Sequence, residues 1–143
     1  MQVYAPPEWT RIRSYALPDY YLRADDSYAK LSPIPFDPYT SMLWKAIPGL
    51  ASPDGVSFES LHQPDCFLRC TQFVLRLSGR EDSVAFREEC TFLHSKGLSD
   101  PSWSSFRSYL YPDLFIAVDG AHLRITAIEY EADKPLATFQ LAY

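Results

Sequence analysis

Short segments in which polar and hydrophobic residues alternate recur along the chain. Three of them hold a hydrophobic residue in the same register between polar neighbours: Thr10-Arg-Ile-Arg-Ser14, Val56-Ser-Phe-Glu-Ser60 and Ser104-Ser-Phe-Arg-Ser108. A two-residue period is typical of a β-strand with one buried face. A Pro-Asp pair follows each segment, and such a pair suits the two central positions of a β-turn. The pattern therefore predicts three strand–turn units.

Each strand–turn unit belongs to a longer repeat. The prolines of the three pairs, Pro18, Pro64 and Pro112, are 46 and 48 residues apart. A second and a third strand follow each pair and, after a longer link, a fourth. These strands carry hydrophobic residues at matching spacing: Leu22, Leu68 and Ile116, then Leu31, Leu77 and Ile125, then Trp44, Phe92 and Phe139. Only 83–89 has a helix-forming composition, and one turn of helix is marginal alone.

Three copies of about four strands predict an all-β domain. A propeller needs at least about four blades to close, and a solenoid needs polar capping repeats. The architecture that closes with three units is the β-trefoil, with three internal repeats and pseudo-threefold symmetry. We expect an N-terminal extension over 1–9 and a single domain over 10–143, with repeats 10–55, 56–103 and 104–143. The predicted core consists of the repeated hydrophobic residues: Ile12, Phe58, Phe106, Leu22, Leu68, Ile116, Leu31, Leu77, Ile125, Trp44, Phe92 and Phe139.

The composition suits a packed globule, with 47% hydrophobic and 15% aromatic residues. The net charge of −5 argues against nucleic acid or an anionic membrane as partner, because phosphate binding depends on clustered Lys and Arg. The first nine residues contain two prolines and a glutamate where a secretory signal has its apolar core. For a complete chain we therefore expect a soluble protein in the cytoplasm or another intracellular compartment; for an excised module the N-terminus gives no information about location.

The cysteines and histidines indicate neither a disulfide framework nor a metal centre. Cys66 and Cys70 lie in one predicted strand, about 13 Å apart at ~3.3 Å per residue, which is too far for a bridge. A bridge from Cys90 to either of them stays open, although reduced, half-buried thiols are favoured. The three histidines occupy non-equivalent places in the copies: His62, His94 and His122. Because they lack metal-ligand spacing, we expect no metal and no cofactor.

The middle copy carries the motifs Phe67-Leu-Arg69, Phe73-Val-Leu-Arg-Leu77, Phe86-Arg-Glu-Glu-Cys-Thr-Phe92 and Gly97-Leu98. In their order and spacing it resembles the β-trefoil of the arabinofuranose-binding domain of α-L-arabinofuranosidase B, the family 42 carbohydrate-binding modules. The resemblance spans 10–143 and is strongest over 56–98. It implies a non-catalytic module, because the chemistry of that family resides in a separate domain.

Members of that family bind a furanose sugar on each repeat, chiefly through a His after the Tyr-Leu-Arg strand and an Asp just before Ala-Thr-Phe. In this chain the His position holds Ala24, Cys70 and Val118. The Asp position holds Ser41, Glu89 and Leu136. The resemblance therefore implies degenerate sugar pockets in which Glu89 alone keeps the charge. The family's tyrosine before the turn proline is kept only as Tyr111, and its turn glycine is Asp in all three copies.

The loss of these ligands on an intact scaffold favours a non-catalytic module that binds a protein partner. The aromatic residues least explained by the repeated core are candidates for the partner surface, since Tyr and Trp are enriched in interfaces: Trp9, Trp103 and Tyr109, with Tyr111 beside them. Local packing between the copies is the alternative for these rings. The alternative function is a carbohydrate-binding module of altered specificity. It would use the degenerate pocket positions Cys70 and Glu89 in the middle copy and Tyr111 with Asp119 in the third.

Nothing in the sequence indicates catalysis, so we expect no enzyme. A serine hydrolase elbow of the form Gly-x-Ser-x-Gly is absent. A glycosidase pair would need two carboxylates about 5–9 Å apart across a cleft, and a trefoil of this size offers shallow pockets. Cys70, next to Arg69, is an activated thiol only if it is exposed, and a buried structural thiol is favoured.

Overall fold

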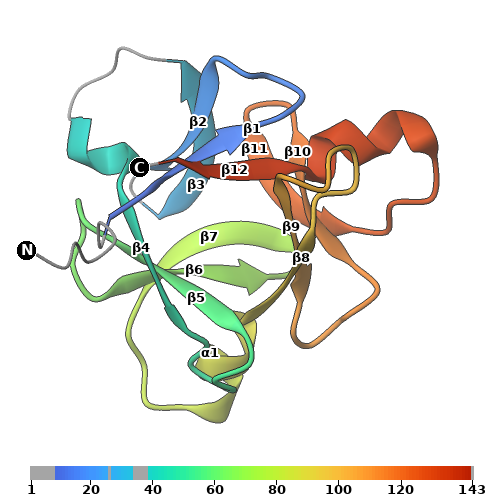
Figure 1. The fold of residues 1–143 in the computed structure, drawn as a ribbon. Coiled ribbons are helices and arrows are strands. Elements are labelled where there is room, and N and C mark those ends of the chain that lie inside the picture. The colour runs from blue at the N-terminus through green and yellow to red at the C-terminus, as the bar shows by residue number, and fades with distance from the viewer. Residues whose placement is uncertain (1–8, 26, 34–38, 143) are drawn as a thin grey trace, which may run out of the picture.

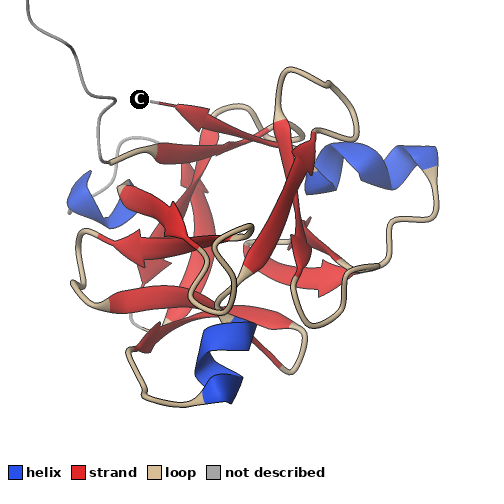
Figure 2. Cartoon of the chain, turned by 60° about the horizontal axis from the view of Figure 1, so that its bottom comes forward, coloured by secondary structure: helices blue, strands red, loops and turns tan. Residues whose placement is uncertain are grey.

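The chain folds into one antiparallel sheet of twelve strands, with short helices around its outside (Figures 1 and 2). A computed structural model describes residues 9–25, 27–33 and 39–142. The elements in chain order are β1 (Arg11–Ser14), β2 (Tyr20–Asp25), β3 (Tyr28–Pro33), η1 (Tyr39–Met42), β4 (Trp44–Pro48), β5 (Val56–Ser60), β6 (Cys66–Thr71), β7 (Val74–Gly79), α1 (Val84–Glu89), β8 (Phe92–Lys96), β9 (Ser104–Ser108), β10 (Phe115–Asp119), β11 (His122–Thr126), η2 (Glu131–Ala137) and β12 (Phe139–Ala142). The all-β prediction is confirmed. The predicted extension over 1–9, except Trp9, lies outside the described residues.

Three hairpins have the same internal register. β2 pairs with β3, β6 with β7 and β10 with β11. The opposed residues are the aliphatic ones that recur in the sequence: Leu22 with Leu31, Leu68 with Leu77, and Ile116 with Ile125. The spacing of these residues in the sequence is thus the spacing of a hairpin, with both partners facing the interior.

Three further strand pairs join the copies. β4 pairs with β5, β8 with β9 and β12 with β1, so the first and last strands lie side by side (Figure 1). Each pair opposes the recurring aromatic residue to the serine that ends the alternating segment: Trp44 to Ser60, Phe92 to Ser108 and Phe139 to Ser14. Since β1 also pairs with β2 and β12 with β9, neither the first nor the last strand is left as a free edge.

The tips of the three hairpins close one end of the sheet. The Leu77 amide donates to the Ser27 carbonyl at 2.9 Å, and the Ile125 amide to the Phe73 carbonyl at 3.0 Å. The Leu31 amide donates to the Ala121 carbonyl at 2.9 Å and completes the ring. Each hairpin therefore bonds to the next through its turn.

The Pro-Asp turns are confirmed and have a common anchor. The amide three residues after Ser14, Ser60 or Ser108 donates to that serine's hydroxyl at 3.0, 3.0 and 3.1 Å. A backbone hydrogen bond then closes each turn, as from the Leu114 amide to the Tyr111 carbonyl at 2.8 Å. The serine that ends each alternating segment thus terminates the strand and starts the turn.

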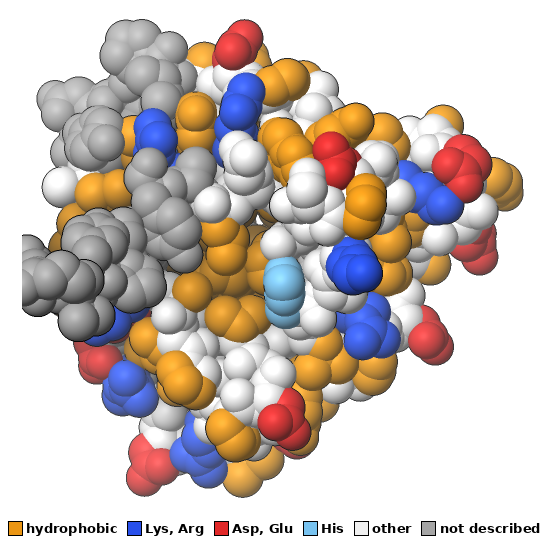
Figure 3. Space-filling model, viewed as in Figure 1, with side chains coloured by type: hydrophobic (Ala, Val, Ile, Leu, Met, Phe, Trp, Pro, Cys, Tyr) orange, Lys and Arg blue, Asp and Glu red, His pale blue; other side chains and the backbone are white. Residues whose placement is uncertain are grey.

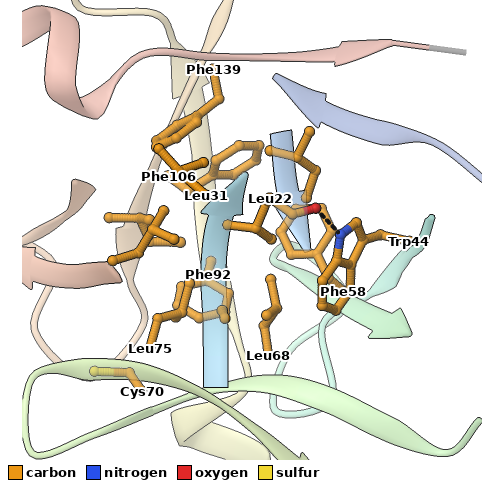
Figure 4. Close-up of a cluster of buried hydrophobic side chains, with 14 of the residues drawn as sticks. Leu22, Leu31, Trp44, Phe58, Leu68, Cys70, Leu75, Phe92, Phe106 and Phe139 are labelled. Atoms are coloured by element: carbon orange, nitrogen blue, oxygen red, sulfur yellow. Dashed lines mark hydrogen bonds between the residues drawn. The ribbon is translucent and has the colours of Figure 1, made fainter. Parts of the chain in front are cut away.

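The hydrophobic interior contains all twelve predicted core residues, each buried (Figure 4). The predicted core set did not include six further residues that are buried among these: Ala24, Ala29, Cys70, Leu75, Val118 and Leu123. Trp44 differs from its counterparts Phe92 and Phe139, because its indole Nε1 donates to the Leu22 carbonyl at 3.0 Å (Figure 4).

A second, smaller cluster explains why the one predicted helical stretch forms a helix. The Ser83 hydroxyl accepts from the Phe86 amide at 3.1 Å and caps α1. The Phe86 ring is fully buried and meets the Phe67 ring edge-on, with centroids 6.1 Å apart. This packing stabilises a helix of six residues that would be too short to persist alone.

The three cysteines are free, as the reduced-thiol interpretation predicts. η1 and η2 occupy links for which the sequence predicted no helix. Across 9–25, 27–33 and 39–142, no helix is long and apolar enough to cross a membrane.

Candidate ligand-binding site

Three of the four predicted pocket residues gather at one place. Cys70 ends the core-facing part of β6, Glu89 ends α1, and Tyr111 lies in the turn before β10. They line a pocket of about 70 Å³ between the second and third copies, with Gln72, Phe73, Ser108 and Leu110 as the other walls. The middle copy therefore supplies Cys70 and Glu89, which stand at the family's His and Asp positions, and the third copy supplies Tyr111.

The turn that carries Tyr111 is held by its backbone. The Tyr111 amide donates to the Ser108 hydroxyl, and the Tyr111 carbonyl accepts from the Leu114 amide at 2.8 Å. The side chain is consequently free to face outward, and it is 49% exposed. A phenol presented from a fixed turn offers a rigid ring and one hydroxyl to a ligand.

The opposite wall is an unusual turn. Only Gln72 and Phe73 separate β6 from β7, because Thr71 pairs directly with Val74. Their φ angles are +54° and +64°, which is the geometry of a type I′ hairpin turn. A bulky residue is rare in this region of φ, and Phe73 is 45% exposed. Its ring lies 5.4 Å from that of Tyr111, centroid to centroid.

Glu89 is positioned by a charged partner. The Arg69 Nε donates to Glu89 Oε1 at 2.6 Å, and Arg69 Nη1 donates to Glu81 at 2.9 Å. The guanidinium also lies over the Phe86 ring, 5.2 Å from its centroid. Within the described chain Glu89 Oε2 has no hydrogen-bond donor, and the Glu89 side chain is 24% exposed. One carboxylate oxygen thus orients the group while the other can accept a hydrogen bond from a ligand.

Cys70 is a structural thiol. It is 8% exposed, and burial raises its pKa to about 11. The activated-thiol alternative is therefore wrong, because a nucleophilic cysteine needs a lowered pKa and access to solvent.

The equivalent positions of the other two copies offer no charged group to a ligand. In the first copy Ala24 and Ser41 are buried, with Ser41 fully so. In the third copy Val118 is buried, and Leu136 packs against the core. An apolar or fully enclosed side chain cannot accept a hydrogen bond from a sugar hydroxyl.

Asp119 lies apart from this pocket. It ends β10 and faces Arg124 across the hairpin, with Oδ2 and Nη1 3.6 Å apart. It lines a different groove, near the hairpin tips. The structure does not bring Asp119 together with Tyr111, contrary to the arrangement expected for the third copy.

The residues predicted for a partner surface have neighbours of their own and do not line the pocket. The Trp103 ring meets the Tyr15 ring edge-on at 5.1 Å, with Arg13 at 5.7 Å from the Trp103 centroid. Trp9 lies beside Lys45, whose Nζ is 5.8 Å from the indole. Tyr109 is half-buried.

Sequence reasoning missed Gln72, Phe73 and Leu110 as site residues. In the sequence Phe73 begins the motif Phe73-Val-Leu-Arg-Leu77, whereas in the structure it belongs to the two-residue turn between Thr71 and Val74, which is the length of a tight hairpin turn. Leu110 is 39% exposed, and its place beside the pocket comes from contact between copies.

Two other features bear on ligands. On the face shown in Figure 3, Lys and Arg are interspersed with Asp and Glu, and hydrophobic side chains line the central hollow. Among the residues that the structure describes, no group of three or more His, Cys, Asp or Glu side chains is placed to hold a metal ion.

The family model described as alpha-L-arabinofuranosidase B (ABFB) domain matches residues 10–141. Over 68 residues, the chain is 42% identical to a probable alpha-L-arabinofuranosidase B of Aspergillus fumigatus, covering 48% of this chain and 13% of that protein. Over 69 residues it is 38% identical to alpha-L-arabinofuranosidase B of Penicillium canescens, covering 48% and 15%. The chain thus spans about one seventh of the curated relatives that it matches.

Solved structures show the same fold at low identity. An arabinofuranosidase complexed with arabinofuranosyl-alpha-1,2-xylobiose superposes with a TM-score of 0.86 at 20% identity, covering 99% of this chain and 32% of that one. The structure described as BEL beta-trefoil superposes with a TM-score of 0.69 at 12% identity, covering 99% and 96%. These likenesses show a β-trefoil-like, all-β fold.

Proposed function

Because this chain belongs to the alpha-L-arabinofuranosidase B domain family, we propose that it is a non-catalytic carbohydrate-binding module with one remaining sugar site. The observation that carries the proposal is the convergence of Cys70, Glu89 and Tyr111 in one pocket. The family's ligand positions in the other copies are apolar or enclosed. We infer that two of the three sites are lost and that the middle one has changed its specificity.

The pocket has the two kinds of group that sugar recognition needs. Glu89, the Gln72 amide and the Tyr111 phenol can exchange hydrogen bonds with hydroxyl groups. The rings of Phe73 and Tyr111 offer apolar faces to the C–H side of a sugar. Cys70 replaces an imidazole with a weakly polar thiol, which is the reason to expect a ligand different from the family's, or a weaker interaction with the same one.

The size of the pocket favours a single sugar unit. A volume of about 70 Å³ holds the edge of one ring rather than a chain. A neighbouring groove of about 430 Å³ shares Phe73, Leu110 and Tyr111 with it. A terminal furanose unit could enter the pocket while the remainder of its glycan lies along this groove. The relatives are alpha-L-arabinofuranosidases, and the solved complex contains an arabinofuranosyl unit, so this sugar unit is the first candidate.

Isothermal titration calorimetry with methyl α-L-arabinofuranoside and with arabinoxylan tests this proposal. Tyr111→Ala should weaken binding by about tenfold, which corresponds to ~1.4 kcal/mol. Glu89→Gln should weaken it by a similar factor, because it removes a charged acceptor. Leu17→Ala is the matched control, since Leu17 occupies the same turn position in the first copy and is 37% exposed. Equal affinities for Tyr111→Ala and Leu17→Ala, or no binding by the unaltered protein, would contradict the proposal.

A protein partner is the second candidate. The exposed Phe73, Leu110 and Tyr111 form an apolar patch at the mouth of the pocket, and aromatic residues are enriched in interfaces. The predicted surface at Trp9, Trp103 and Tyr109 remains part of this alternative. A partner that is captured by the unaltered protein but not by Tyr111→Ala, together with no response to any glycan, would favour it.

We also infer that the three copies are related by an approximate threefold axis. The equal registers of the hairpins and the ring of hydrogen bonds at their tips support this symmetry. The single site would then be a local departure from it, in which one of three related surfaces keeps polar groups.

A further inference from the structure

A second groove lies at the closed end of the sheet, where the three hairpins meet. It has a volume of about 530 Å³ and draws walls from each hairpin. Tyr28 comes from β3, Arg76 from β7, and His122 and Arg124 from β11. It shares Gln72 and Phe73 with the pocket described above but includes neither Glu89 nor Tyr111.

The charge of this groove is opposite in sign to that of the whole chain. Its walls carry two guanidinium groups and one imidazole against a single carboxylate, that of Asp119. The chain as a whole has a net charge of −5. A local excess of positive charge attracts anionic ligands to this place, although the whole chain is acidic.

Arg76 is held in position without an ionic partner. Its guanidinium lies over the Tyr28 ring, 5.0 Å from the centroid. Over the described ranges Arg76 forms no ion pair, and no hydrogen bond of its side chain is found. The Tyr28 ring in turn meets the His122 ring edge-on at 5.9 Å. The planar guanidinium is thus pre-oriented by stacking while its N–H donors remain available.

Arg124 adds a second, loosely engaged cation. Its distance of 3.6 Å from the Asp119 carboxylate is long for a charge-assisted hydrogen bond, which is typically about 2.7–2.9 Å. Both side chains are at least half exposed. An incoming anion can therefore bind Arg124 with little loss from the broken ion pair, since ion pairs between exposed side chains are weak.

The other walls are Gln72 and four apolar or aromatic side chains, those of Tyr28, Phe73, Val74 and Leu123. The rings of Tyr28 and Phe73 are exposed, whereas Leu123 is fully buried. A ligand with both an anionic group and C–H faces fits this mixture better than a simple ion. The volume is within the ~300–1,000 Å³ range of small-molecule sites.

We propose that this groove binds an acidic saccharide, with Arg76 and Arg124 recognising a carboxylate on the sugar and Tyr28 and Phe73 contacting its ring. The inference rests on the proposed function only in that the domain binds carbohydrate; it uses a different surface. Guanidinium groups match carboxylates in a two-point geometry. The module would thereby hold a glycan through a neutral unit at one site and an acidic unit at the other.

The test compares trigalacturonic acid with its methyl ester by calorimetry, since the ester removes the charge of each carboxyl group and keeps the sugar rings and their hydroxyls. The acid should bind, and the ester at least about tenfold more weakly, because hydrogen bonds to a charged acceptor are stronger than those to a neutral one. Arg76→Gln and Arg124→Gln should each weaken binding of the acid by about tenfold. Arg87→Gln removes the same charge from the outer surface of α1, where Arg87 pairs with Asp82, and should leave affinity unchanged.

Two further probes separate the alternatives. Tetraglutamate that binds as tightly as trigalacturonic acid would show general attraction of acidic peptides and overturn the proposal. A sulfated trisaccharide that binds more tightly than the carboxylate would also overturn the assignment to uronic acids. Melting temperatures within a degree or so of the unaltered protein establish that the arginine variants are folded.

Binding of the acidic sugar can be tested separately from the furanose pocket, which is the pocket lined by Cys70, Glu89 and Tyr111. Tyr111→Ala should leave trigalacturonic acid binding intact, whereas Arg76→Gln should leave binding of the neutral furanoside intact. Loss of acid binding in Tyr111→Ala with retention in Arg76→Gln would place the acidic sugar in the furanose pocket and contradict binding in the groove at the hairpin tips. Failure of the neutral furanoside alone would contradict the proposed function and not this inference.

Discussion

Phe73 occupies a turn position where most proteins place glycine. Its φ of +64° costs a non-glycine residue ~1–2 kcal/mol, and its half-exposed ring recovers little of this through burial. Backbone strain of this kind persists where surrounding structure over-determines it, and it is concentrated at functional sites. The Phe73 ring lines both the pocket of Cys70, Glu89 and Tyr111 and the groove at the hairpin tips, so both proposals assign this strained residue a contact with ligand.

The strain at Phe73 can be measured with two substitutions. Phe73→Gly should be more stable than Phe73→Ala by about 1 kcal/mol, because both remove the ring and only alanine keeps the left-handed penalty. Ala121 is the control: it occupies the second turn position of the third hairpin without a positive φ. There Ala121→Gly should lower the free energy of unfolding by ~0.4–1 kcal/mol. Urea denaturation measures the free energy of unfolding of each variant. If glycine were less stable than alanine at position 73, as is expected at position 121, the assignment of strain to Phe73 would be contradicted.

Among the recurring aromatic residues of the core, Trp44 differs from its counterparts Phe92 and Phe139, and a substitution measures the contribution of its hydrogen bond. Trp44→Phe would make this copy like the others, yet it should lower the free energy of unfolding by ~1–3 kcal/mol. The reason is that the Leu22 carbonyl loses the buried Nε1 donor at 3.0 Å. Thermal and chemical unfolding measure the loss. A Trp44→Phe protein as stable as the original would show that the hydrogen bond contributes nothing.

The buried thiols predict a decline of stability in alkali. Burial raises the pKa of Cys70 to about 11 and that of Cys90 to about 12, from 9.0. The unfolded chain therefore loses these protons first, so their contribution is complete below about pH 9 and is lost as pH rises toward 12. Between pH 8.5 and 10.5 the melting temperature of Cys90→Ala should fall less steeply than that of the unaltered protein. If the melting temperatures of the two proteins fell equally steeply with pH, the raised pKa of Cys90 would be contradicted.

Among the secondary-structure elements, the strands could be predicted because their pattern is local. β1, β5 and β9 alternate between buried and half-exposed residues along most of their length, and the Ser-x-x-x-Pro-Asp turns that follow them need only neighbouring residues. η1 and η2 could not be predicted in this way. η2 contains Pro135 and lacks a side-chain cap, so its formation depends on packing against β10 rather than on its own sequence.

The links between elements contain close backbone contacts that constrain their glycines. A Cβ on Gly49 would lie 2.5 Å from the Ser52 carbonyl oxygen and 2.7 Å from Thr91 Cγ2. Gly49→Ala should therefore cost ~1–3 kcal/mol of unfolding free energy, as other overpacked positions do. Gly79→Ala is the matched change, since the nearest atom there is 4.0 Å away. Equal stability of the two variants would contradict the close approach.

The pocket could be predicted in part. Cys70 and Glu89 followed from the family resemblance, and the structure places them together. Tyr111 was assigned to a site of the third copy with Asp119. It contributes instead to the middle site, because the turn before β10 lies next to the β6–β7 tip. Which copies share a pocket is a property of the closed sheet, and residue spacing within a copy carries no information about it.

At the scale of the whole molecule, one closed sheet supports three surfaces, one on each copy of the repeat. These surfaces differ in the polarity of their side chains. The hairpin-tip hydrogen bonds and the shared core hold all three in place. Loss of a ligand from one surface therefore leaves the fold intact, and each surface can change separately. On this view a single polar pocket and a cationic groove at the hairpin tips are both compatible with the same interior.

A titration of the ¹⁵N-labelled protein with methyl α-L-arabinofuranoside, followed by amide chemical shifts, tests the central claim of a single sugar site most directly. We predict saturable shifts confined to the amides around Cys70, Gln72, Glu89 and Tyr111, and none around Ala24 or Val118. Shifts at all three copies, shifts confined to residues outside this pocket, or no shifts at millimolar sugar would contradict it.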